Sequence, residues 1–152
     1  MGKYNALEDS YSPLKEALKH GGIGNSTQVK TVWVDVENSS SDLLNQQLQD
    51  VVDGIIIPDG FGARGVEGKI PAAHYARKKK IPFWGICYGM HLASISLARS
   101  LLKIENANST EVTEDCTNLI GLFTEWQKDT IIERRSGKIE YRGTMRLGDY
   151  TC

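Results

Sequence analysis

The stretch that decides the fold is residues 81–102, which read IPFWGICYGMHLASISLARSLL. An apolar run comes first, then a cysteine, Cys87, between two glycines, and then a helical pattern of apolar residues. This order predicts a strand, a sharp turn and a helix, the arrangement known as a nucleophile elbow. Glycines at positions 85 and 89 suit such a turn, because the turn is strained and crowded and glycine relieves both conditions.

Cys87 is therefore the candidate nucleophile of the chain. The helix that follows directs backbone N–H groups toward the sulfur, which favours the reactive thiolate. A buried structural cysteine is the alternative interpretation, since a lone cysteine commonly behaves as a small apolar residue. The position of Cys87 at a strand-to-helix junction favours the nucleophile.

Composition narrows the range of partners. The formal net charge is −1 at pH 7, which gives no reason to expect nucleic acid or an anionic membrane as a partner. No apolar run is long enough to span a bilayer. The three cysteines and three histidines show no metal-ligand spacing, so we expect no metal site. An odd number of cysteines is typical of free thiols in a reducing compartment, and we expect a cytoplasmic protein.

Strands and helices are predicted to alternate along one α/β domain, residues 1–152. The first helix is expected to start with Ser12 as its N-cap and to stop at Gly21 and Gly22. Strands are expected over 29–36, 54–58, 81–86 and 119–123, helices over 43–52, 67–80 and 89–102, and a loop or edge hairpin over 142–152. Such alternation favours a parallel sheet, which binds ligands where its strands end. A Gly-rich loop, residues 59–65, follows one of these strands, and Cys87 follows the next.

Five stretches resemble the glutamine amidotransferase domains of the CTP synthase family, which are triad-type, class I amidotransferases. They are the start of the chain (2–11), GFGARGVEGK (60–69), GICYGM (85–90), ANSTE (107–111) and GTMRLG (143–148). The resemblance implies a three-layer, flavodoxin-like α/β fold with a mostly parallel sheet. It also implies that the sequence lacks the C-terminal part of that domain.

The resemblance implies hydrolysis of L-glutamine through a cysteine thioester. The ammonia released would pass to a synthetase domain, in the same or another chain, that aminates UTP to CTP. ATP, Mg and UTP would bind in that synthetase domain, GTP would act as an effector, and this domain itself would hold no cofactor. The full enzyme would be a homo-oligomer.

The same motifs imply roles for single residues. Cys87 would be the nucleophile, and the backbone N–H groups of Gly60 and Tyr88 would form the oxyanion hole. Phe61, His91 and Glu111 would bind the substrate, with Glu111 on its amino group. Arg64 and Arg146 would contact the effector or another domain. A capped turn around Glu111 and solvated surface arginines are the simpler alternatives.

Three positions depart from the family pattern, and one motif is absent. Asp59, Tyr88 and His91 stand where the family has Gly, Leu and Gln. The family's general base is the His of an H-P-E motif, which we expect to lie beyond Cys152. Two alternatives therefore stay open: a catalytically inactive amidotransferase-like module with a regulatory or oligomerisation role, and a related elbow enzyme such as a thiol peptidase or chaperone-like hydrolase.

Overall fold

The computed structural model describes Gly2, residues 8–36, Leu48 and residues 52–121, 125–128 and 131–134. The chain divides into two compact units, Met1–Gly121 and Leu122–Cys152. The single domain expected over 1–152 stays a prediction. Apart from Leu48, which is helical and buried, and Val52, the helix expected over 43–52 lies outside the described residues, and so does the segment 142–152.

The first expected helix is present, but it starts differently from the prediction. A 3-10 turn, η1 (Glu8–Tyr11), leads directly into α1 (Ser12–Gly24). The N-cap position therefore falls on Tyr11, and no side chain caps this end by a hydrogen bond. The prediction of Ser12 as the N-cap is wrong, because the preceding turn already bends the backbone into the helix.

The end of α1 also differs, since the helix continues past its first two glycines to Gly24. Glycine ends a helix by adopting a positive φ, and neither Gly21 nor Gly22 does so. The cap comes instead from Asn25, whose side-chain amide donates a 2.8 Å hydrogen bond to the carbonyl of Gly21.

The strand expected over residues 29–36 is wrong. The described backbone forms only an isolated parallel bridge there, between Asp35 and Gly2. Trp33 stacks on Tyr11 with ring centres 5.4 Å apart, so this segment rests against the start of α1 rather than pairing with a strand. β-branched residues favour an extended backbone, but a strand also needs a partner for its backbone hydrogen bonds.

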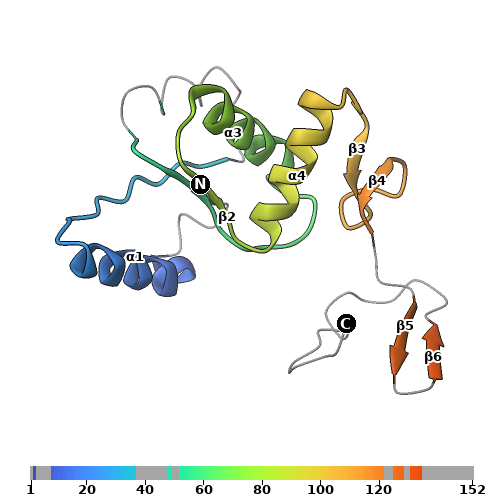
Figure 1. Ribbon diagram of the computed structural model, residues 1–152, viewed down its shortest axis with the longest axis horizontal. Helices are drawn as coiled ribbons and strands as arrows, with labels where there is room; N and C mark the ends of the chain where they lie inside the picture. The colour runs from blue at the N-terminus through green and yellow to red at the C-terminus, as the bar shows by residue number, and fades with distance from the viewer. Residues whose placement is uncertain are drawn as a thin grey trace. The chain divides into compact units, whose positions relative to one another are not determined.

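Two short strands form the parallel pair on which the candidate site is built. β1 (Ile55–Ile57) pairs in register with β2 (Phe83–Gly85), so that Ile56 lies beside Trp84. Both strands lie inside the expected ranges. Ile55 and Ile57 are buried in the larger hydrophobic cluster of the described residues. The order β1–α3–β2–α4 is a βαβ unit followed by a further helix (Figure 1).

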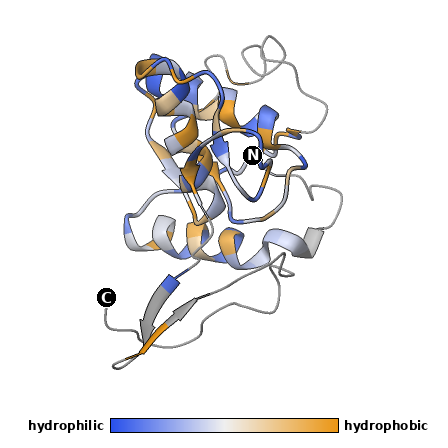
Figure 2. Ribbon diagram, turned by 90° about the vertical axis from the view of Figure 1, so that its right-hand side faces the viewer, coloured by the Kyte–Doolittle hydropathy of each residue, from blue (hydrophilic) through white to orange (hydrophobic). Residues whose placement is uncertain are grey.

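Helix α3 (Val66–Lys79) matches its predicted range to within one residue at each end. It starts after Gly65 and ends before Lys80, both with positive φ, of 76° and 58°. Ile70 and Ala73 lie on its buried face, as predicted. In Figure 2 hydrophobic and hydrophilic residues alternate along the helices, as expected where one helix face is buried.

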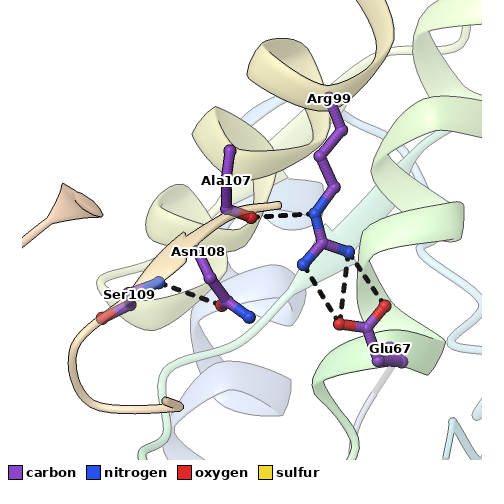
Figure 3. Close-up of polar contacts among 5 residues, drawn as sticks. All are labelled: Glu67, Arg99, Ala107, Asn108 and Ser109. Atoms are coloured by element: carbon purple, nitrogen blue, oxygen red, sulfur yellow. Dashed lines mark hydrogen bonds and ion pairs between the residues drawn. The ribbon is translucent and has the colours of Figure 1, made fainter. Parts of the chain in front are cut away.

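One arginine, Arg99, connects three elements of the fold. Arg99, on α4 (Tyr88–Leu101), donates from Nε to the carbonyl of Ala107 on β3 (Ala107–Ser109) at 2.9 Å. Its guanidinium also forms a 2.9 Å ion pair with Glu67 of α3 (Figure 3). Arg99 therefore holds the start of β3 beside the α3–α4 pair.

The remaining strands form two further pairs. β3 pairs in parallel with β4 (Thr117–Ile120), which starts two residues before the predicted strand. In the second unit β5 (Glu125–Lys128) and β6 (Ile131–Arg134) form an antiparallel hairpin, which the sequence analysis missed. The described residues thus form an α/β structure with parallel strand pairs in small sheets, in agreement with the predicted class.

Candidate active site

Cys87 lies at a sharp turn between β2 and α4, as the sequence predicted. Its backbone has φ 49° and ψ −107°, a conformation that side-chain-bearing residues rarely adopt. The N–H of Gly89 donates to the carbonyl of Ile86 at 2.8 Å, and the N–H of Met90 donates to the carbonyl of Cys87 at 3.0 Å. The turn presents Cys87 as an exposed, free thiol. Strain of this kind is typical of functional turns.

The two glycines of the elbow are required by space. A Cβ on Gly85 would lie 2.6 Å from the backbone of Gly89, and a Cβ on Gly89 would overlap the carbonyl of Ile57. Neither glycine has a positive φ, so the strained conformation belongs to Cys87 itself. The expected crowding is confirmed, whereas the expected conformational need for glycine is not.

The Gly-rich loop after β1 passes beside the first residue of α4. A Cβ on Gly60 would lie 3.8 Å from the ring of Tyr88 and 3.8 Å from the Nζ of Lys69. The two proposed oxyanion-hole residues therefore lie together. Tyr88 is the first residue of α4, where a backbone N–H has no partner within the helix. This end of the helix carries partial positive charge.

One residue of the loop is held on both sides. The hydroxyl of Tyr88 donates a 2.6 Å hydrogen bond to the carbonyl of Gly62. The N–H of Gly62 donates a 2.7 Å hydrogen bond to the carboxylate of Glu111. Gly62 has φ 75°, which suits glycine. Burial, and then the charge of Glu111, raise the pKa of Tyr88 to about 12, so its hydroxyl remains a donor near neutral pH.

Glu111 belongs to a turn directly after β3. Its N–H donates to the hydroxyl of Ser109 at 3.2 Å, and the N–H of Val112 donates to the carbonyl of Ser109 at 2.9 Å. The capped turn considered as the simpler alternative is therefore present. The carboxylate of Glu111 nevertheless points to the Gly-rich loop, 49 residues away in sequence. The turn is therefore compatible with a substrate contact by Glu111, which stays a prediction.

His91 lies one helical turn after the elbow. Its backbone N–H donates to the carbonyl of Cys87 at 3.2 Å. Its ring meets the ring of Tyr88 edge to face, with centres 6.2 Å apart. The Nδ1 atom is buried and has no hydrogen-bond partner among the described residues. His91 therefore presents an unsatisfied polar atom on the side of α4 that carries Tyr88.

The other predicted residues are more peripheral. Phe61 is 52% exposed, and Asp59 and Arg64 are also exposed, on the same loop as Gly60. Arg146 lies outside the described residues. The structure thus brings Gly60, Tyr88, His91 and Glu111 together around the elbow and leaves three loop side chains toward solvent.

Lys69 is a member of this site that the sequence analysis missed. It is fully buried on α3, with its ammonium 5.7 Å from the centre of the Tyr88 ring. Lys69 occupies the position three residues after Val66 and one before Ile70, so it falls on the apolar face of the helix. A lysine on an apolar face was the signal that could have identified it.

The described ranges contain neither a metal-ligand cluster nor a membrane-spanning helix. No three histidine, cysteine or acidic side chains in these ranges gather as metal ligands. No described helix has the length and apolar character needed to cross a membrane. A groove of about 790 Å³ lies between α1 and the β1–β2 pair, and Cys87 does not line it.

An elbow cysteine beside a Gly-rich loop on an α/β scaffold defines a class, and comparison with known proteins identifies it. Residues 6–151 match the family model of the class-I glutamine amidotransferases, and the chain belongs to this family. The glutaminase domain of Trypanosoma brucei CTPS, solved with bound acivicin, is 33% identical with a TM-score of 0.70. That match covers 77% of this chain and 46% of the other. The predicted fold is therefore confirmed.

The particular relatives are CTP synthases. The CTP synthase of Maricaulis maris is 48% identical over 150 residues, which is 99% of this chain. The CTP synthase of Bartonella quintana is 46% identical over 152 residues, the whole of this chain. The chain spans 28% of the length of each of these relatives. The resemblance deduced from five short stretches is confirmed over nearly the whole sequence.

Proposed function

We propose that this chain is the glutamine-hydrolysing part of a CTP synthase and that Cys87 is its nucleophile. The observation that carries the proposal is the strained, exposed Cys87 at the start of α4, next to Gly60 of the loop. The family match and the CTP synthase relatives support the same activity.

In the proposed reaction the Cys87 thiolate attacks the side-chain amide carbon of glutamine. A C–S bond forms, and the amide oxygen takes up negative charge, which the N–H groups of Gly60 and Tyr88 stabilise. The C–N bond then breaks, and the nitrogen leaves as ammonia after it receives the proton that a base took from the thiol. Water finally hydrolyses the thioester to glutamate and restores the thiol. The resemblance assigns the role of the base to the histidine of the H-P-E motif.

Substrate binding is proposed for the groups around the elbow. One oxygen of the Glu111 carboxylate already accepts the N–H of Gly62. A carboxylate accepts several hydrogen bonds, so Glu111 retains capacity for the amino group of glutamine. Phe61 offers an exposed apolar ring at the loop. His91 is also proposed to contact the substrate, and a contact through its buried Nδ1 would require that atom to become exposed.

The wider assembly is proposed by analogy with the CTP synthase relatives. We expect the ammonia to reach a synthetase domain that uses ATP, Mg and UTP, in a cytoplasmic, homo-oligomeric enzyme. Arg64 and Arg146 are proposed contacts of the effector GTP or of another domain. The exposure of Arg64 is compatible with such a contact.

An inactive module with a regulatory role is the second candidate, favoured by the three departures at Asp59, Tyr88 and His91. The side chain of Asp59 is exposed, where water and salt screen its charge from the oxyanion site. This placement weakens the argument that Asp59 blocks catalysis. The exposed thiol favours the active enzyme over the inactive module.

Covalent labelling separates the two candidates. A glutamine-analogue electrophile, followed by peptide mapping, should label Cys87 and leave Cys116 unlabelled. Cys116 is the matched control, because its thiol already donates to the carbonyl of Thr113 at 3.3 Å and lacks an elbow. In a protein that includes the histidine base, glutamine-dependent ammonia release should be lost in Cys87→Ser and retained in Cys116→Ser. Absence of labelling at Cys87 together with absence of ammonia release would favour the inactive module.

A further inference from the structure

The Gly-rich loop, residues 59–65, connects β1 to α3 and passes beside the elbow. The last residues of the loop accept the first hydrogen bonds of α3. The N–H of Val66 donates to the carbonyl of Ala63, and the N–H of Lys69 donates to the carbonyl of Gly65. Glycines leave the backbone free to rotate. Contacts from outside the loop, made by Tyr88 and Glu111, contribute to its orientation near Gly60.

Those contacts meet at Gly62. Tyr88 holds the peptide group after Gly62 through its carbonyl, at 2.6 Å. Glu111 holds the peptide group before Gly62 through its N–H, at 2.7 Å. Hydrogen bonds on both flanking peptide groups restrict φ and ψ of the only residue between them. Gly62 is two residues from Gly60, so this restraint reaches the proposed oxyanion N–H.

We propose that the hydroxyl of Tyr88 is a positioning group for glutamine hydrolysis: it holds Gly62, and through Gly62 it aligns both the Gly60 N–H and the Glu111 carboxylate. The proposal rests on the proposed function of Cys87. Tyr88 thereby has two separate tasks, since its backbone N–H faces the substrate and its side chain orders the loop.

The surroundings of Tyr88 suit this task. The residue is 1% exposed and packs with Val66 and Leu92 in the cluster between α3 and α4. A buried ring has few alternative orientations, so its hydroxyl is held toward Gly62 at little entropic cost on substrate binding. A leucine at this position could not donate a hydrogen bond, so the restraint on Gly62 depends on the Tyr88 hydroxyl.

Two probes of Cys87 in the full chain test the proposal. A glutamine-analogue electrophile needs the aligned loop and Glu111, whereas iodoacetamide needs only an accessible thiol. In Tyr88→Phe the rate with the analogue should fall about three- to tenfold, the effect of one hydrogen bond. The rate with iodoacetamide should not change. Tyr75→Phe is the matched control, because Tyr75, on α3, is a buried tyrosine like Tyr88 but is not part of the site. Both rates should be unchanged in this variant.

A second measurement tests the path through Gly62. In glutamine hydrolysis by a protein that includes the histidine base, the losses in kcat/KM of Tyr88→Phe and Glu111→Gln should not add in the double variant, because both act on Gly62. Additive losses would overturn the link between the two side chains.

The outcomes are distinguishable. An unchanged analogue rate in Tyr88→Phe, with a reactive wild type, overturns the positioning role alone. An equal fall with both probes also overturns it, because a general collapse of the elbow would then explain the loss. A wild type that reacts with iodoacetamide but not with the analogue overturns the proposed function and the positioning role together.

Discussion

Gly89, on the first turn of α4, lies directly against the carbonyl of Ile57 at the end of β1. The obstacle is backbone of the core strand, which cannot move aside as a flexible side chain would. We expect Gly89→Ala to lower the free energy of unfolding by about 1–3 kcal/mol through overpacking. Denaturant unfolding measures this change.

The control for this substitution is Gly21→Ala. Gly21 lies inside α1 and has no atom within 4 Å of its added Cβ. Alanine favours helix more than glycine does, so we expect this variant to gain up to about 1 kcal/mol. A Gly89→Ala variant as stable as Gly21→Ala would contradict the packing argument.

The strain at Cys87 predicts an unusual order of stability. A side-chain-bearing residue with φ 49° costs of order 1–3 kcal/mol, which glycine avoids. We therefore expect Cys87→Gly to be more stable than Cys87→Ala by about 1 kcal/mol, although both remove the thiol. Thermal or chemical unfolding of the two variants measures the difference. An alanine variant equal to or more stable than the glycine variant would show that the turn is not strained.

The contacts of Arg99 predict that a substitution of Arg99 lowers stability more than a substitution of its partner Glu67. Glu67 is 70% exposed in its side chain, whereas that of Arg99 is 23% exposed and also serves the buried carbonyl of Ala107. Glu67→Gln removes a surface ion pair and should cost less than about 1 kcal/mol. Arg99→Met leaves a buried acceptor without its donor and should cost about 1–3 kcal/mol. Equal losses in denaturant unfolding would mean that the carbonyl contact contributes nothing.

The raised pKa of Tyr88 predicts that the free energy of unfolding falls at alkaline pH. Its pKa rises from 10.0 to about 12 on folding, first through burial and then through the Glu111 carboxylate. The neutral hydroxyl is favoured in the folded state, so its contribution is fully present below pH 10 and is lost as the pH rises through about 12. Tyr88→Phe should therefore lose less stability than the wild type over this interval. Identical pH dependence of the two unfolding free energies would contradict this expectation.

Local sequence patterns predicted much of the site. The apolar runs before residues 58 and 87 predicted β1 and β2, and the helical spacing after each loop predicted α3 and α4. The elbow followed from the order of strand, glycine, cysteine and glycine, because that signal lies within five consecutive residues. Motif resemblance then placed Gly60 and Glu111 in the same site.

Other features depended on partners that the local pattern does not contain. Residues 29–36 have the composition of a strand, but the described backbone has only one bridging partner there. The burial of Lys69 depends on α4 covering the apolar face of α3. Ser12 has the residue type of an N-cap, but the 3-10 turn before it moves the N-cap position to Tyr11.

The sequence by itself determined the α/β class, the positions of α3 and α4, and the identity of the candidate nucleophile, because each depends on residues adjacent in the chain. Only the tertiary structure decided that Tyr88 reaches Gly62, 26 residues away, and that Glu111 reaches it from 49 residues away. Hydrogen bonds act over about 3 Å, and the periodicity of nearby residues does not predict which distant groups will come that close. They form where folding brings the end of β1, the start of α4 and the turn after β3 to one place.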